Sequence, residues 1–451
     1  MRPKQILLSG DVMRILYTPA GDTDPIRDFR DGAILHIIRH YAPDKVVVFL
    51  SAEMVVKEEN NYCYSKAIKN LMPDCELEFI RTGIVNAHKM EELLPLAEEF
   101  LKIRRANVQA EFLLNLSSGT PQMKSVMSFL ATDFENVRAI QVDSPRRQSN
   151  RSNFANQDND DIDFIIESNE DNLEDAPNRC SEPPLKLLRR YSLRHQMLSL
   201  IDNYDYASAL KMYQQNKALF DESVGKLLNH VVNREMLKTV EAFKCIEQVG
   251  KISLRATKNR EVQELNEFFM IMELRQKKKQ LPEFIVKITP FLYYLTKFYF
   301  VNKMGIGLDT IGDAAKNKSV KISCAKLNKN HPDLMKALES KYWNFRDGTD
   351  LAFSNLLIML EAMPRCNQEL LSLLKELRVV EEKQRNYIAH TIVSVTEEEL
   401  MNIEPKLNSA QILEKLRKAF NLVMYGEQYF KKNIYDELNY HIKKTLEDFR
   451  L

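Results

Sequence analysis

The sequence predicts an α/β, Rossmann-like N-terminal domain followed by an all-α C-terminal half. Up to about residue 145, short β-branched apolar runs alternate with segments of helical period, the pattern of a parallel sheet covered on both faces. After Pro183-Pro184 the apolar spacing is helical almost to the end. Glycine is only 12 of 451 residues, so tight turns are few, which argues against an all-β sandwich or barrel.

The elements follow one another in strand–helix order. Strands are expected at 5–8, 45–50, 76–80, 111–114 and 137–142, and helices at 32–41, 53–71, 90–103 and 123–134. Residues 145–180 lose the pattern, and their short apolar run at 162–166 predicts a polar loop with one edge hairpin.

The C-terminal half divides into two helical blocks. Helices are expected at 185–201, 206–213 and 225–246, then from 260 onward, including 290–300, 369–389 and 410–430. The run at 290–300 is rich in aromatic residues and lysines, which fits either core packing or stacking on bases. We therefore expect a sensing domain at 1–180, a helical linker domain at 181–259 and a third domain at 260–451.

Charge is distributed unevenly along the chain. Residues 1–157 are neutral, residues 158–175 hold nine acidic and no basic residues, and residues 181–451 carry a net charge of +9. A basic half of this kind suits a polyanion bound through counterion release, or is a solvated surface.

Two further features bound the class of protein. The longest apolar stretch, 284–308, is interrupted by three lysines and a proline, so no transmembrane helix is expected. Six cysteines contain no CxxC pair, which argues against a zinc site or a disulfide framework and favours a reducing cytoplasm.

A candidate anion site follows the fourth predicted strand, in the segment NLSSGTPQM at 115–123. Thr120 suits an N-cap and Pro121 the first helical position, while Gly119 lets the backbone approach a ligand closely. The helix N-terminus, with the Ser117 and Ser118 hydroxyls, favours a phosphate; a well-capped helix that binds nothing is the alternative. The long polar segment 16–25 after strand one, with Thr18, would face this loop across the switch point of the sheet.

An arginine–histidine pair, RNYIAH at 385–390, crowds polar groups at the end of a long amphipathic helix. Arg385, Asn386 and His390 suit metal-free RNA cleavage, with histidine as acid or base and arginine on the phosphate charge. Residues 385 and 390 are ~140° apart on an ideal helix. Either the helix ends there, or two copies of the chain share one phosphate; a structural Arg–His pair is the alternative reading.

Taken together, TPAGDTDP, NLSSGTPQM and RNYIAH make the chain resemble the CARF–HEPN endoribonucleases of type III-A CRISPR systems, the sixth protein of the Csm series. The resemblance implies a CARF sensor, a helical linker and a HEPN ribonuclease domain. The HEPN catalytic motif then falls on Arg385, Asn386 and His390. The activator-binding residues implied by the resemblance are Ser9, Thr18, Gly21, Asp24, Ser117, Ser118, Gly119, Thr120 and Gln122.

The same resemblance implies a mechanism. A homodimer would bind cyclic oligoadenylate, in this type cyclic hexaadenylate, and cleave single-stranded RNA to a 2′,3′-cyclic phosphate and a 5′-hydroxyl, with no metal or other cofactor. Self-limiting cleavage of the activator would involve Thr120 and polar groups of the first loop. No membrane and no stable DNA binding are expected. A CARF-type transcription regulator, or a HEPN toxin or interaction module without cyclic-nucleotide control, are the alternatives.

Overall fold

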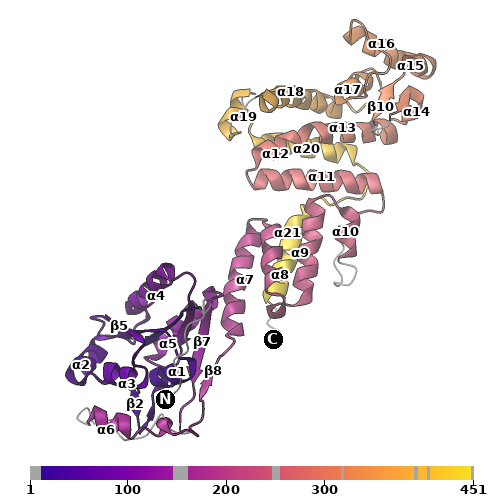
Figure 1. Ribbon diagram of the computed structural model, residues 1–451. Helices are drawn as coiled ribbons and strands as arrows, with labels where there is room; N and C mark the ends of the chain where they lie inside the picture. The colour runs from indigo at the N-terminus through magenta and orange to yellow at the C-terminus, as the bar shows by residue number, and fades with distance from the viewer. Residues whose placement is uncertain are drawn as a thin grey trace. The chain divides into compact units, whose positions relative to one another are not determined.

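The computed structural model divides the chain into two compact units, Met1–Leu193 and Arg194–Leu451 (Figure 1). It describes residues 12–145, 161–245, 254–315, 319–390, 395–403 and 407–447, with the backbone alone at 384–390 and 402–403. The first unit is α/β and the second is mostly helical, so the predicted fold class is confirmed.

The first unit is built on a six-stranded sheet of order β5-β4-β1-β6-β7-β8. Neighbouring strands are parallel except β8, which runs antiparallel to β7. The strands are β1 (Arg14–Pro19), β4 (Lys45–Leu50), β5 (Glu76–Arg81), β6 (Glu111–Asn115), β7 (Val137–Val142) and β8 (Cys180–Ser181). A small hairpin joins β2 (Ile26–Arg27) and β3 (Arg30–Asp31).

Helices cover both faces of this sheet, as the continuous apolar strands predict. Alternate residues of β1 enter different cores: Leu16 packs in one cluster with α1 and α3, and Tyr17 packs in the other with α4 and α5. The helices are α1 (Ala33–Tyr41), α2 (Ala52–Asn61), α3 (Cys63–Leu71), α4 (Leu94–Ala106) and α5 (Pro121–Asp133).

The strand expected at 5–8 lies outside the described residues, and three other predictions for this unit need correction. Residues 16–19 belong to the buried strand β1 rather than to a loop, because β4 pairs with residues 15–19 and β6 with residues 14–17. The run expected as an edge hairpin is the helix α6 (Ile162–Glu167), capped by Asp161. The helix expected at 53–71 is two helices, because Tyr62 adopts a left-handed backbone between them.

The second unit is a stack of helices that starts within α7 (Lys186–Asp202). The next helices are α8 (Tyr206–Gln215), α9 (Glu222–Glu235), α10 (Thr239–Lys244), α11 (Arg260–Lys277), α12 (Leu281–Val286) and α13 (Ile288–Phe298). The remainder are α14 (Leu308–Ile311), α15 (Cys324–Asn330), α16 (Pro332–Lys341), α17 (Phe353–Glu361), α18 (Gln368–His390), α19 (Glu397–Ile403), α20 (Ser409–Val423) and α21 (Ile434–Glu447).

The helical unit departs from the predictions at three points. The helix expected at 225–246 breaks at Leu237, whose φ of 58° separates α9 from α10. The helix expected at 410–430 ends at Val423. A short hairpin, β9 (Gly312–Ala314) and β10 (Val320–Ile322), interrupts the helices.

The aromatic run at 290–300 lies largely in the core of this unit, with Phe291 and Phe300 buried. Core packing therefore describes it better than stacking on bases does. The last helix, α21, returns to pack against α9, and Tyr206 of α8 donates a hydrogen bond of 2.7 Å to the Asn439 side-chain oxygen. In the part of the chain that the structure describes, no helix is both long and apolar enough to cross a bilayer.

Candidate functional site

Two loops meet at the carboxyl ends of the adjacent strands β1 and β6. The approach is so close that a Cβ on Gly21 would lie 2.7 Å from the backbone nitrogen of Gly119. Gly119 itself has a φ of +80°, and a Cβ there would lie 2.8 Å from the sulfur of Met123. Glycine is therefore required at both positions, by contact in one loop and by contact and backbone conformation in the other.

Asn115, the last residue of β6, connects the two loops. Its buried side-chain nitrogen donates hydrogen bonds of 2.9 Å to Thr18 Oγ1 and 2.7 Å to Ser118 Oγ. Its side-chain oxygen accepts the backbone N–H of Ser117 at 2.8 Å. Asn115 belongs to the NLSSGTPQM motif but was not among the predicted site residues. The signal was an amide that ends an otherwise apolar strand.

Asp24 closes the first loop. Its carboxylate is fully buried and accepts the backbone N–H groups of Gly21, at 3.2 Å, and Ile34, at 3.1 Å. Burial raises the pKa of this carboxyl, against the opposing effect of those hydrogen bonds and one from Ser118. The Lys57 ammonium donates to the Asp24 carbonyl at 2.9 Å, so a cation that sequence reasoning missed also borders this loop.

The second loop ends at the N-terminus of α5. The Thr120 hydroxyl accepts the Met123 N–H at 3.3 Å and donates to the Ala87 carbonyl at 2.7 Å, so it caps the helix and holds the loop after β5. Gln122 lies in the first turn, and its buried side-chain oxygen has no hydrogen-bond partner among the described residues. Backbone N–H groups and the helix dipole at this end favour an anion.

The predicted activator-binding residues therefore fall into three groups. Thr18, Asp24 and Ser118 are buried and shape the loops rather than face solvent. Gly21, Ser117, Gly119, Thr120 and Gln122 are partly exposed along the loops. Ser9 lies outside the described residues.

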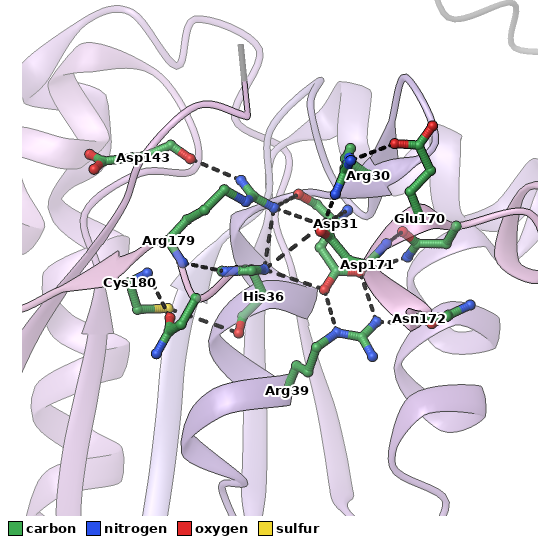
Figure 2. Close-up of polar contacts among 12 residues, drawn as sticks. Arg30, Asp31, His36, Arg39, Asp143, Glu170, Asp171, Asn172, Arg179 and Cys180 are labelled. Carbon is green, nitrogen blue, oxygen red and sulfur yellow. Dashed lines mark hydrogen bonds and ion pairs between the residues drawn. The ribbon is translucent and has the colours of Figure 1, made fainter. Parts of the chain in front are cut away.

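A separate polar cluster lies where α1, β3, η3 (Glu170–Asn172) and β8 meet (Figure 2). Asp31, His36 and Asp171 offer ligand atoms within 4.8 Å of one another, as a metal site would. However, Arg39 Nε lies 2.7 Å from Asp31 Oδ2, and Arg179 Nη2 lies 2.8 Å from Asp171 Oδ2. Because cationic side chains already pair with both carboxylates, this cluster fits a clamp on the segment 169–180 better than a metal site.

The contacts of His36 and Asp31 set the charge within the clamp. The backbone N–H of Arg179 donates to His36 Nε2 at 2.9 Å, and His36 Nδ1 lies 3.5 Å from Asp31 Oδ2 and 3.2 Å from Arg179 Nη2. Burial alone would raise the pKa of Asp31, but hydrogen bonds from His36 and Arg39 outweigh it and lower the pKa to about 2. The ionised carboxylate is therefore the form that the fold stabilises.

The predicted catalytic residues lie on α18, which continues as one helix to His390. Arg385, Asn386 and His390 all belong to its last turns, and their side chains are outside the described residues. Because the helix does not end at Arg385, the arrangement in which a helix end separates Arg385 from His390 is excluded. Upstream on the same helix, the buried Glu381 accepts the Thr289 hydroxyl at 2.8 Å, which ties α18 to α13.

Comparison with known proteins identifies this architecture. Domain models of the CRISPR-associated protein Csm6 match the chain in order: its CARF domain over 75–180, its 6H domain over 183–235 and its HEPN domain over 254–443. The chain belongs to the Csm6 family. The predicted family and the CARF and HEPN assignments are thereby confirmed.

Characterised relatives of this Csm6-family chain are named CRISPR system endoribonucleases. The protein from Mycobacterium tuberculosis is 27% identical over 446 residues, which span 96% of this chain and 99% of that protein. The Enterococcus italicus protein is 27% identical over 64% of this chain, and the match spans 66% of its own length. The Csm6′ of Streptococcus thermophilus is 31% identical over 53% of this chain and 64% of its own length.

A solved structure shares the fold. Enterococcus italicus Csm6 bound to cyclic hexa-2′-fluoro-hexa-dAMP superimposes with a TM-score of 0.64 at 22% sequence identity. The superposition covers 96% of this chain and 100% of that chain. The order of α/β and helical parts is therefore common to both proteins.

Proposed function

We propose that this Csm6-family protein is a CRISPR type III accessory endoribonuclease that cuts single-stranded RNA in its HEPN domain. Cyclic hexaadenylate, bound by the CARF domain, activates it allosterically. The protein acts as a homodimer without a metal ion. Its relatives are named endoribonucleases, and the Enterococcus italicus structure holds a cyclic hexanucleotide analogue, which supports both halves of the proposal.

The observation that carries the catalytic half is the unbroken course of α18 from Gln368 to His390. On a helix of 3.6 residues per turn, positions 385 and 390 lie ~140° apart. A single helix does not bring both positions to one side. A second copy related by a two-fold axis supplies the complementary group, so dimerisation becomes a condition of activity.

The chemistry follows from the residue types. The ribose 2′-hydroxyl attacks the adjacent phosphorus as one histidine takes its proton, and the P–O5′ bond breaks as a proton returns to the 5′ oxygen. Arg385 carries a permanent positive charge for the phosphorane-like oxygens. The products are a 2′,3′-cyclic phosphate and a 5′-hydroxyl. Histidine, with an unperturbed pKa of ~6.5, can exchange these protons near neutral pH.

The activator half rests on the two loops joined by Asn115. They place partly exposed polar groups, two glycine backbones and the N-terminus of α5 at one edge of the sheet, which suits a phosphate-bearing ligand. A ring that prefers one dimer arrangement shifts the population of catalytic geometries in the HEPN domains. Thr120 and polar groups of the first loop are the candidates for slow cleavage of the ring itself.

Single-turnover cleavage of single-stranded RNA with cyclic hexaadenylate in EDTA tests the proposal. We expect cleavage to persist in EDTA and to yield cyclic-phosphate ends. Loss of activity that Mg²⁺ restores would overturn the metal-free scheme. Thermal-shift measurements with cyclic tetra- and hexaadenylate test the activator, and failure of both rings to raise the melting temperature would remove cyclic-nucleotide control.

A further inference from the structure

The only tryptophan of the chain stands fully in solvent. Trp343 lies in the segment KYWNFR at 341–346, between α16 and α17, and its relative exposure is 102%. A tryptophan buries more apolar area than almost any other side chain, so a fully solvated indole is unusual. The position of this ring therefore requires an explanation beyond folding.

The residues on either side of Trp343 are anchored, so the ring is presented rather than loose. The Tyr342 hydroxyl donates to the Asn355 side-chain oxygen at 3.2 Å, and the Tyr342 and Phe345 rings pack 5.8 Å apart. Phe345 also packs against the main hydrophobic core of the unit. Beyond it, Asp347 accepts the backbone N–H of Cys324 at 2.7 Å. Trp343 is the one aromatic residue of this turn that the fold does not use.

The surroundings of the ring favour nucleic acid over a protein partner. A protein interface needs a contiguous apolar patch, yet within the described residues of 308–361 the large exposed apolar side chains are only Tyr342, at 36%, and Trp343. The other exposed neighbours are polar, with Lys341 and Arg346 on either side of the turn. An exposed π-face with a lysine two residues before it and an arginine three residues after it in the chain suits a single strand, in which bases stack and phosphates follow the backbone.

We propose that Trp343 is a base-stacking contact for the single-stranded RNA substrate, with Lys341 and Arg346 as phosphate contacts. The proposal rests on the endoribonuclease function proposed above. The turn is linked through α17 to the beginning of α18, whereas Arg385 lies roughly 25 Å further along that helix. The contact therefore serves RNAs long enough to reach both places and adds affinity rather than chemistry.

The solitary tryptophan makes a direct test available. In the full-length His390→Ala protein with cyclic hexaadenylate, titration with a single-stranded RNA of about 30 nucleotides should quench the tryptophan emission saturably. Trp343→Ala in the active protein should raise KM for that RNA by roughly 5- to 150-fold, and the effect should shrink as the RNA is shortened. Trp343→Phe should recover part of the loss, since a smaller aromatic ring still stacks.

Tyr425→Ala provides the matched control, because Tyr425 is another exposed aromatic residue of the same unit, at 85%. It should leave KM unchanged. RNA binding seen by anisotropy without any change of tryptophan emission, or a Trp343→Ala KM within twofold of the parent, would overturn the proposal. Absence of both RNA binding and RNA cleavage in the parent protein would instead remove the endoribonuclease function, and the stacking proposal with it.

Discussion

Replacing Asn115 with alanine should weaken activator binding while the catalytic helix keeps its function. The substitution removes three hydrogen bonds, those to Thr18, Ser118 and the Ser117 backbone, from a side chain with 0% exposure. At ~1 kcal/mol net for each, the loss is about 3 kcal/mol. Binding of the cyclic ligand would then also have to order the two loops, which lowers the net free energy of binding. We therefore expect the half-saturating activator concentration to rise tenfold or more.

The assay is a cyclic hexaadenylate titration of RNA cleavage, with thermal melting measured in parallel. We expect the Asn115→Ala curve to shift to higher activator concentration and to reach the parental rate at saturation. Ser125→Ala is a suitable control, because that partly exposed hydroxyl donates to the Pro121 carbonyl within α5. A variant that melts earlier but keeps the parental titration curve would refute the reasoning, since the hydrogen bonds would then support the fold without shaping the site.

Other substitutions test the remaining sites. His390→Ala should lose at least ~10²-fold in single-turnover rate and keep the activator thermal shift. If one site needs both copies, an equal mixture of this variant with parental subunits, after subunit exchange, should retain about a quarter of the parental activity rather than half. The pKa of Asp31 is about 2 in the folded protein, below the unfolded value of ~3.9. The ~2–3 kcal/mol of stabilisation from this carboxylate is therefore present above pH ~4 and is lost as the pH falls to 2. In urea unfolding, Asp31→Asn should be less stable than the parent at pH 7, and the difference should close at pH 2. Gly119→Ala forces a φ of +80° on a side chain and a contact with Met123, so melting should occur several degrees earlier and activator binding should weaken.

Local sequence patterns were sufficient wherever burial is continuous. The strands at 45–50 and 137–142 were predicted with their observed bounds, because a β-branched apolar run between helical segments is typical of a buried strand in a parallel sheet. The cap at Thr120 followed from the residue order alone, since a hydroxyl side chain directly before a proline is a local signal for an N-cap followed by the first helical position. The predicted helices were too long where one residue with a left-handed backbone divides the segment into two helices, as at Tyr62 and Leu237.

The fold class, the family and the two loop motifs were readable from the amino-acid sequence, because they depend on residues close together in the chain. Which polar groups meet became visible only in the folded chain. Asn115 reaches Thr18 across 97 residues, and Asp31 receives the Asn169 amide across 138. The tertiary structure also decided that Trp343 faces solvent while Phe291 is buried. Helical or strand period tells which face of an element is apolar, but the partner of that face, or its absence, is set by packing between distant segments.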